Sequence, residues 1–205
     1  MLRFVKQRVF KIMPDLQKIT DRTPIAREWL RNARKLQDAG QVFSAYFSAY
    51  IALVVCATQI LGDSGKVATG DDEHWEREAI EYVMNFKSAE IAAFLDTDNG
   101  VRIKQAVWLR EIPENKNLRI IGHGNDTILQ QAAKNLSAYF GPLRKSSLSP
   151  NEVLNQAQDL STVFRKVRNR LFHGGKTYDP EGDDGELLNK LNPLLIEIVE
   201  ILQKH

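Results

Sequence analysis

The residues best suited to chemistry are Arg168 and His173, which stand five positions apart in the segment 167–176. Histidine is the side chain that titrates closest to neutral pH, so His173 can take or give a proton near pH 7. The guanidinium of Arg168 is permanently charged and binds phosphate oxygens through two parallel hydrogen bonds. Such a pair suits phosphodiester cleavage, in which the arginine stabilises charge on the phosphorus oxygens. Asn169 supplies an amide to orient either side chain, and an attacking RNA 2′-hydroxyl needs no metal.

The segment that precedes His173 has the periodicity of an amphipathic helix. Apolar residues recur at i, i+4, i+7 and i+11: Leu160, Phe164, Val167 and Leu171. The glycines at 174 and 175 predict the end of this helix, because glycine readily adopts the left-handed conformation found there. A strict helix places positions five apart about 140° from each other. We therefore expect a loosened last turn, which lets His173 approach Arg168 at the mouth of a helix-lined groove.

The same residues also suit a structural role. An arginine beside an apolar stripe usually extends its charge to water, and a histidine before glycines often caps a helix. Arg165, Arg170 and Lys176 surround the pair, either as contacts for an RNA backbone or as a solvated helix face. A second pair, Arg119 and His123, has a spacing one residue shorter and lies in a segment typical of a loop or short strand. We interpret this second pair as structural or, at most, as lying close to the substrate.

Taken together, Arg168, Asn169 and His173, with the Gly-Gly-Lys that follows, resemble the signature of the HEPN superfamily (higher eukaryotes and prokaryotes nucleotide-binding domain). The apolar stretch 38–61 and a final helix over about 186–203 also look like those of this family. The resemblance implies an all-α helical bundle and a metal-independent endoribonuclease of the toxin–antitoxin or antiviral-defence type. It implies Arg168 and His173 as catalytic residues supported by Asn169, with no cofactor.

The resemblance further implies a homodimer whose two motifs face one cleft, RNA as the substrate, and an antitoxin or other defence protein as a partner. One branch of the family has a tyrosine two residues after the histidine. This chain has Gly175 there, which argues against regulation through a modified tyrosine. Other members are non-catalytic modules that bind nucleotide or RNA or dimerise with a partner protein. That function is the alternative to the ribonuclease.

Length and composition fit a single domain over 1–205, with 43% hydrophobic residues and a net charge of +2. This charge permits nucleic acid as a partner but does not indicate a dedicated binder. Cys56 is the only cysteine, which fits a reducing cytoplasm, and the spread of the four histidines predicts no metal site. We expect 1–20 to form a helical extension packed on the bundle, with a membrane-surface helix as the alternative.

Helical periodicity dominates the rest of the chain. Helices are predicted over 24–37, 43–61, 72–94, 127–140, from Ser149 to the motif, and over 186–203. The apolar run 45–61 has polar interruptions and falls short of the ~20 residues that span a membrane, so we interpret it as the central buried helix. Residues 96–100 are predicted as a turn, and 101–125 as an insertion with a short hairpin or a helical turn. Acidic residues over 179–184 are typical of a solvated turn.

Overall fold

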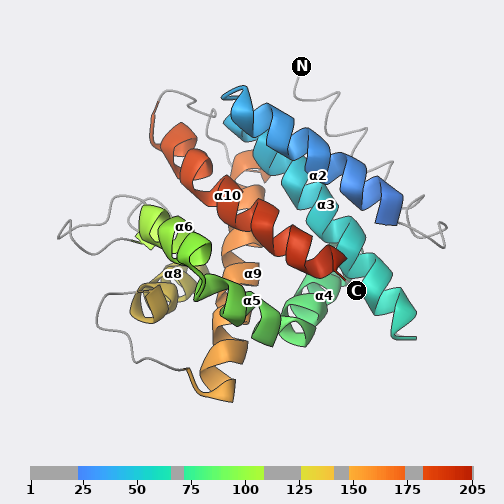
Figure 1. The fold of residues 1–205 in the computed structure, drawn as a ribbon, viewed down its shortest axis with the longest axis vertical. Coiled ribbons are helices and arrows are strands. Elements are labelled where there is room, and N and C mark those ends of the chain that lie inside the picture. Colours follow the sequence, from blue (N-terminus) through green and yellow to red (C-terminus); the bar gives the residue numbers. More distant parts are fainter. Residues whose placement is uncertain (1–22, 66–71, 109–125, 141–147, 174–181, 205) are drawn as a thin grey trace.

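The structure is a computed structural model that describes residues 23–65, 72–108, 126–140, 148–173 and 182–204. Every regular element within these ranges is an α-helix, so the all-α prediction is confirmed (Figure 1). The helices are α2 (Thr23–Asp38), α3 (Val42–Asp63), α4 (Asp72–Phe86), α5 (Ser88–Leu95), α6 (Asp98–Trp108), α8 (Thr127–Phe140), α9 (Pro150–His173) and α10 (Asp183–Gln203). The predicted extension 1–20, most of the acidic turn, and residues 109–125 with the Arg119–His123 pair lie outside the described residues.

Helix α3 forms the centre of the bundle, where it packs against α2, α10 and α4 (Figure 1). Gly40 closes the turn from α2 with φ +71°, a conformation that favours glycine. Among the described helices α3 alone is long and apolar enough to cross a membrane, yet 78% of that window is buried inside the structure. The prediction of a central buried helix is confirmed, and α3 supplies the surface against which α2, α10 and α4 pack.

Helix α9 is a second organising element and packs against α8, α4 and α5. Its start is a capping box: the Glu152 carboxylate accepts hydrogen bonds from the Ser149 backbone N–H (2.8 Å) and hydroxyl (2.7 Å). The predicted apolar stripe is buried at Leu160, Phe164 and Val167. This packing fixes the rotation of α9 and therefore the direction in which its polar residues face.

The single helix predicted over 72–94 is wrong, because the chain breaks at Lys87 into α4 and α5. The backbone of Lys87 has φ −100° and ψ 15°, which departs from helical values. The break lets the two halves serve different neighbours: α4 packs against α3 and α9, whereas α5 packs against α9 and α6. The apolar pattern continues across the break, so periodicity alone does not reveal it.

The turn predicted over 96–100 is shorter than expected, and a hairpin at 101–103 is wrong, because α6 begins at Asp98. Gly100 makes this tight α5–α6 junction possible. A Cβ atom at Gly100 would lie 2.1 Å from the carbonyl oxygen of Phe94 and 2.7 Å from the Cα of Leu95. Only glycine therefore fits where α6 passes over the end of α5.

Helix α10 packs against α3 and also contacts α2 and α6 (Figure 1). Asn192 is fully buried in α10, where its Nδ2 donates to Gln37 Oε1 (2.6 Å) and to the Val42 carbonyl (2.8 Å). The next residue, Pro193, has no N–H, so the carbonyl of Asn189 loses its usual helical donor. The bonds of Asn192 hold this interrupted turn against α2 and α3.

Candidate functional site

The residues predicted to form the site lie on the last turns of α9. Those whose side chains the structure describes are all partly buried: Arg165, Arg168, Asn169 and Arg170. The backbone stays helical through His173, so the loosened turn that we expected is not present, and positions 168 and 173 lie about 140° apart around the helix axis. The His173 side chain and Lys176 lie outside what the structure describes.

Arg168 is held on several sides by neighbours from three helices. Its Nη1 donates to Asn169 Oδ1 at 2.8 Å, and its Nη2 lies 3.6 Å from Glu76 Oε2 of α4. The guanidinium carbon also lies 5.7 Å from the centre of the Tyr50 ring of α3, a cation–π distance. The side chain of Arg168 is only 15% exposed, so these contacts fix the direction of a guanidinium that would otherwise sample many rotamers.

Glu76 links Arg168 to α3 as well as to α4. Its Oε1 accepts a 2.6 Å hydrogen bond from the Tyr50 hydroxyl, while its Oε2 faces Arg168. Burial, and next the negative charge of Glu76, raise the pKa of Tyr50 well above its usual value. Tyr50 therefore stays protonated and donates to the carboxylate throughout the neutral range. Arg168, Glu76, Tyr50 and Asn169 form what we call the Arg168 cluster.

Tyr46 fixes α3 against α9 one helical turn from Tyr50. Its hydroxyl donates to the backbone carbonyl of Phe164 at 2.7 Å, and its ring stacks on that of Tyr50 with centroids 6.4 Å apart. Burial raises the pKa of Tyr46 well above its usual value, against the opposing charge of Arg168. Tyr46 therefore stays neutral, and its hydrogen bond sets the spacing between α3 and the end of α9.

Other cations of this region of α9 also face carboxylates. Arg165 Nη2 lies 3.2 Å from Glu81 Oε1, and Lys166 Nζ lies 2.9 Å from Asp126 Oδ2. The Arg165 side chain is 15% exposed, whereas that of Glu81 is 41% exposed. The positive charge that the sequence places here is therefore partly balanced by acidic groups from α4 and from the residue before α8.

Sequence reasoning brought Arg168 and Asn169 together but missed Glu76 and Tyr50. Glu76 occupies the buried stripe of α4, four residues before Ile80 and seven before Val83. A carboxylate on an apolar stripe needs a partner when it is buried, and this is the signal that the sequence offered. Tyr50 gave a similar signal, as a polar end on a nearly continuous apolar helix.

Among the described residues, no group of three or more His, Cys, Asp or Glu side chains is arranged to hold a metal ion. The chemistry that the Arg168 cluster can supply is a fixed positive charge supported by a carboxylate and an amide. Such a charge suits an anionic substrate or a structural ion pair. Comparison with protein-family models, with characterised proteins and with solved structures gave no match.

Proposed function

We propose that this chain is a metal-independent endoribonuclease in which Arg168 and His173 act on the RNA phosphodiester. The observation that carries the proposal is the oriented guanidinium of Arg168, fixed by Glu76, Asn169 and the Tyr50 ring on the helix that also ends in His173. Preorganised charge is the main means by which enzymes stabilise a developing anion. The sequence resemblance to the HEPN superfamily points to the same residues.

In the proposed reaction His173 removes the proton of the RNA 2′-hydroxyl. The 2′-oxygen forms a bond to the adjacent phosphorus, the bond from phosphorus to the 5′-oxygen breaks, and that oxygen takes up the proton that His173 now holds. Arg168 stabilises the negative charge on the phosphorus oxygens, and Asn169 positions the guanidinium. The products are a 2′,3′-cyclic phosphate and a 5′-hydroxyl. A phosphate bound here shares the guanidinium with Glu76, so Glu76 acts as a positioning residue.

The proposal extends to assembly. Positions 168 and 173 point about 140° apart on one helix, so we place the active cleft between two copies of the chain, each offering the end of its α9. Arg165, Arg170 and Lys176 would contact the flanking RNA backbone there. The setting we propose is a cytoplasmic defence or toxin system in which a partner protein such as an antitoxin restrains the enzyme.

A second candidate function has a specific observation in its favour. Arg165, Lys166 and Arg168 each pair with a carboxylate, and Arg168 is mostly covered. Pairing of this kind is what a non-catalytic module requires, one that uses the end of α9 to bind nucleotide or RNA or to dimerise with a partner. This alternative predicts RNA binding without cleavage.

The test is cleavage of a mixed RNA pool in EDTA by the native chain and by His173→Ala. His74→Ala is the matched control, since His74 is an exposed histidine of α4 that is not part of the motif. The proposal predicts cleavage by the native chain and by His74→Ala, loss of cleavage in His173→Ala, and 5′ ends that a kinase labels directly. Magnesium-dependent cleavage that leaves 5′-phosphates contradicts the mechanism. Absence of cleavage by the native chain, with RNA binding retained, supports the non-catalytic module.

A further inference from the structure

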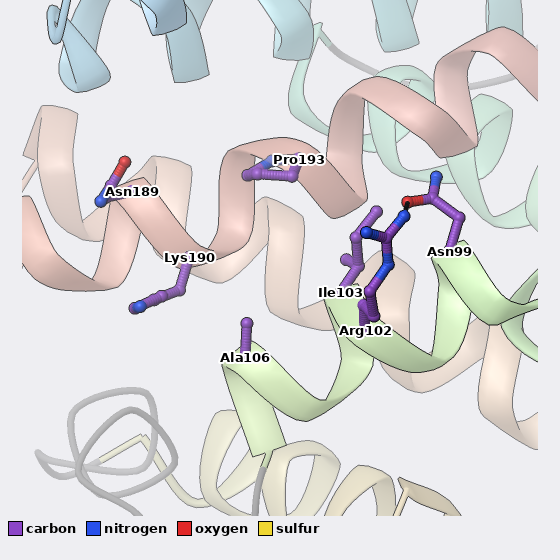
Figure 2. Close-up of a pocket in the computed structure, with 7 residues that line it drawn as sticks. All are labelled: Asn99, Arg102, Ile103, Ala106, Asn189, Lys190 and Pro193. Carbon is purple, nitrogen blue, oxygen red and sulfur yellow. Dashed lines mark hydrogen bonds between the residues drawn. The ribbon is translucent and has the colours of Figure 1, made fainter.

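A pocket lies between α6 and α10, two helices that contribute no residue to the Arg168 cluster (Figure 2). Its volume is about 360 Å³, which is within the range of small-molecule sites. One wall is a single face of α6, and the other is the interrupted turn of α10. The residues that line it are Asn99, Arg102, Ile103, Ala106, Asn189, Lys190 and Pro193.

The sequence of both walls explains why this space stays open. Ala106 is small, so it leaves room on the face of α6 where a longer side chain would reach α10. On α10, Pro193 fills little of the gap and withholds the N–H that would bind the Asn189 carbonyl. The pocket is therefore bordered by a backbone acceptor that regular helix geometry does not satisfy. Asn192, on the opposite side of this turn, holds it in place through Gln37 and Val42.

The pocket has cationic ends and an apolar floor. Figure 2 shows Arg102 and Asn99 together at one end, Lys190 toward the other, and Ile103, Ala106 and Pro193 between them. The Arg102 guanidinium donates to Asn99 Oδ1 at 3.3 Å, which orients it along α6. Among the residues that the structure describes, no carboxylate lines the pocket, and neither Arg102 nor Lys190 forms an ion pair.

We propose that this pocket binds a phosphate monoester with a compact organic body, such as a sugar phosphate or a nucleoside monophosphate. The phosphate takes charge-assisted hydrogen bonds from Arg102 and an amide hydrogen bond from Asn99. The body lies on Ile103, Ala106 and Pro193, and a hydroxyl at its far end donates to the Asn189 carbonyl beside Lys190. The site does not depend on the proposed ribonuclease, because it shares no residue with the Arg168 cluster.

The test is a calorimetric titration of the full native chain with each of four probes: ribose 5-phosphate, AMP, adenosine and inorganic phosphate. We expect the two phosphate monoesters to bind with Kd at or below about 1 mM, and adenosine to bind at least about tenfold more weakly, because it lacks the charged contact. Preference for ribose 5-phosphate or for AMP identifies which body the floor accepts. Inorganic phosphate binding as tightly as either ester overturns the role assigned to the floor.

Three variants locate the binding. Arg102→Gln removes the charge at the Asn99 end and is expected to weaken both esters about tenfold. Ala106→Trp fills the pocket from an exposed helix position and should abolish binding. Arg31→Gln makes the same change of charge on the exposed face of α2 and should leave binding unaltered. The proposal is overturned if neither ester binds to the native chain, or if both pocket variants, folded by circular dichroism, bind as the native chain does.

Discussion

Replacing Glu76 with glutamine perturbs the Arg168 cluster with the least change of shape. The amide oxygen can still accept the hydrogen bond from Tyr50, which is 2.6 Å long in the native structure. The change removes the negative charge that faces Arg168 across 3.6 Å and puts an amide NH2 group, which cannot accept a hydrogen bond, in its place. Arg168 is then left largely covered without its counter-ion, and breaking a buried pair on one side is the costly way to disrupt it.

The expected loss of stability follows from this geometry. Two unit charges 3.6 Å apart attract by about 4.6 kcal/mol at an effective dielectric constant of about 20. Part of this attraction offsets the desolvation of the two side chains, which are 15% and 11% exposed. Because some solvent reaches the pair, the loss should fall below the ~3–5 kcal/mol of a fully buried pair. We predict that Glu76→Gln lowers the free energy of unfolding by about 2–3 kcal/mol.

The assay is urea denaturation of the native chain and the variant at pH 7, with unfolding monitored by circular dichroism. Glu81→Gln is the matched control, since Glu81 faces Arg165 at 3.2 Å but is 41% exposed, and it should cost at most about 1 kcal/mol. The double variant Glu76→Gln/Arg168→Gln should recover part of the loss, because it removes both charges together. Equal effects of Glu76→Gln and Glu81→Gln would refute the claim that Glu76 fixes a covered guanidinium.

Three further perturbations test the packing of the bundle. Tyr46→Phe removes the 2.7 Å hydrogen bond to the Phe164 carbonyl and should lower the free energy of unfolding by about 1 kcal/mol, with an unchanged denaturant m-value. A loss below about 0.3 kcal/mol would contradict the claim that this bond holds α3 against α9. Gly100→Ala forces a Cβ to 2.1 Å from the Phe94 carbonyl oxygen and should lower the unfolding free energy by about 2–3 kcal/mol; a neutral result would contradict the tight α5–α6 junction. Burial raises the pKa of Asp159 to about 6, and its Oδ2 is buried without a hydrogen-bond partner. The folded state therefore holds this proton more tightly than the unfolded state, so the contribution of Asp159 to stability falls as pH rises from about 4 to 6 and stays low above that. The free energy of unfolding of Asp159→Asn, relative to that of the native chain, should consequently rise as the pH increases over this window. A difference between the two proteins that is constant from pH 4 to 7 would contradict the raised pKa of Asp159.

The sequence predicted a helix correctly where its start signal and its apolar periodicity indicated the same segment. The start at Ser149 and the apolar stripe through Phe164 both placed α9, and the structure agrees with them. The break at Lys87 was missed because the apolar spacing continues through it. The break depends on tertiary packing, since α4 packs against α3 and α9 whereas α5 packs against α9 and α6. The helical start at Asp98 was missed because its turn residues fit a loop equally well, and the close passage at Gly100 is visible only in three dimensions.

The contacts of the candidate site also fall into two kinds, those predictable from one segment and those that depend on tertiary packing. Adjacent residues such as Arg168 and Asn169 are readable from one segment, and they do lie together. Glu76 and Tyr50 come from helices far away in sequence, and only the packing of α3 and α4 against the end of α9 brings them to the guanidinium. The pairing of Arg165 with Glu81 likewise depends on that packing, so the balance of charge around the motif was not predictable from the net charge of the chain.

The central claim is that His173 and Arg168 promote attack by the RNA 2′-hydroxyl. The most direct measurement is single-turnover cleavage in EDTA of an RNA strand and of the same strand with every 2′-hydroxyl methylated, by the native chain and by His173→Ala. The account predicts that the native chain cleaves only the unmodified strand and that His173→Ala is slower by about 10²–10⁴-fold. Cleavage of the methylated strand, or an undiminished rate in His173→Ala, would contradict the account.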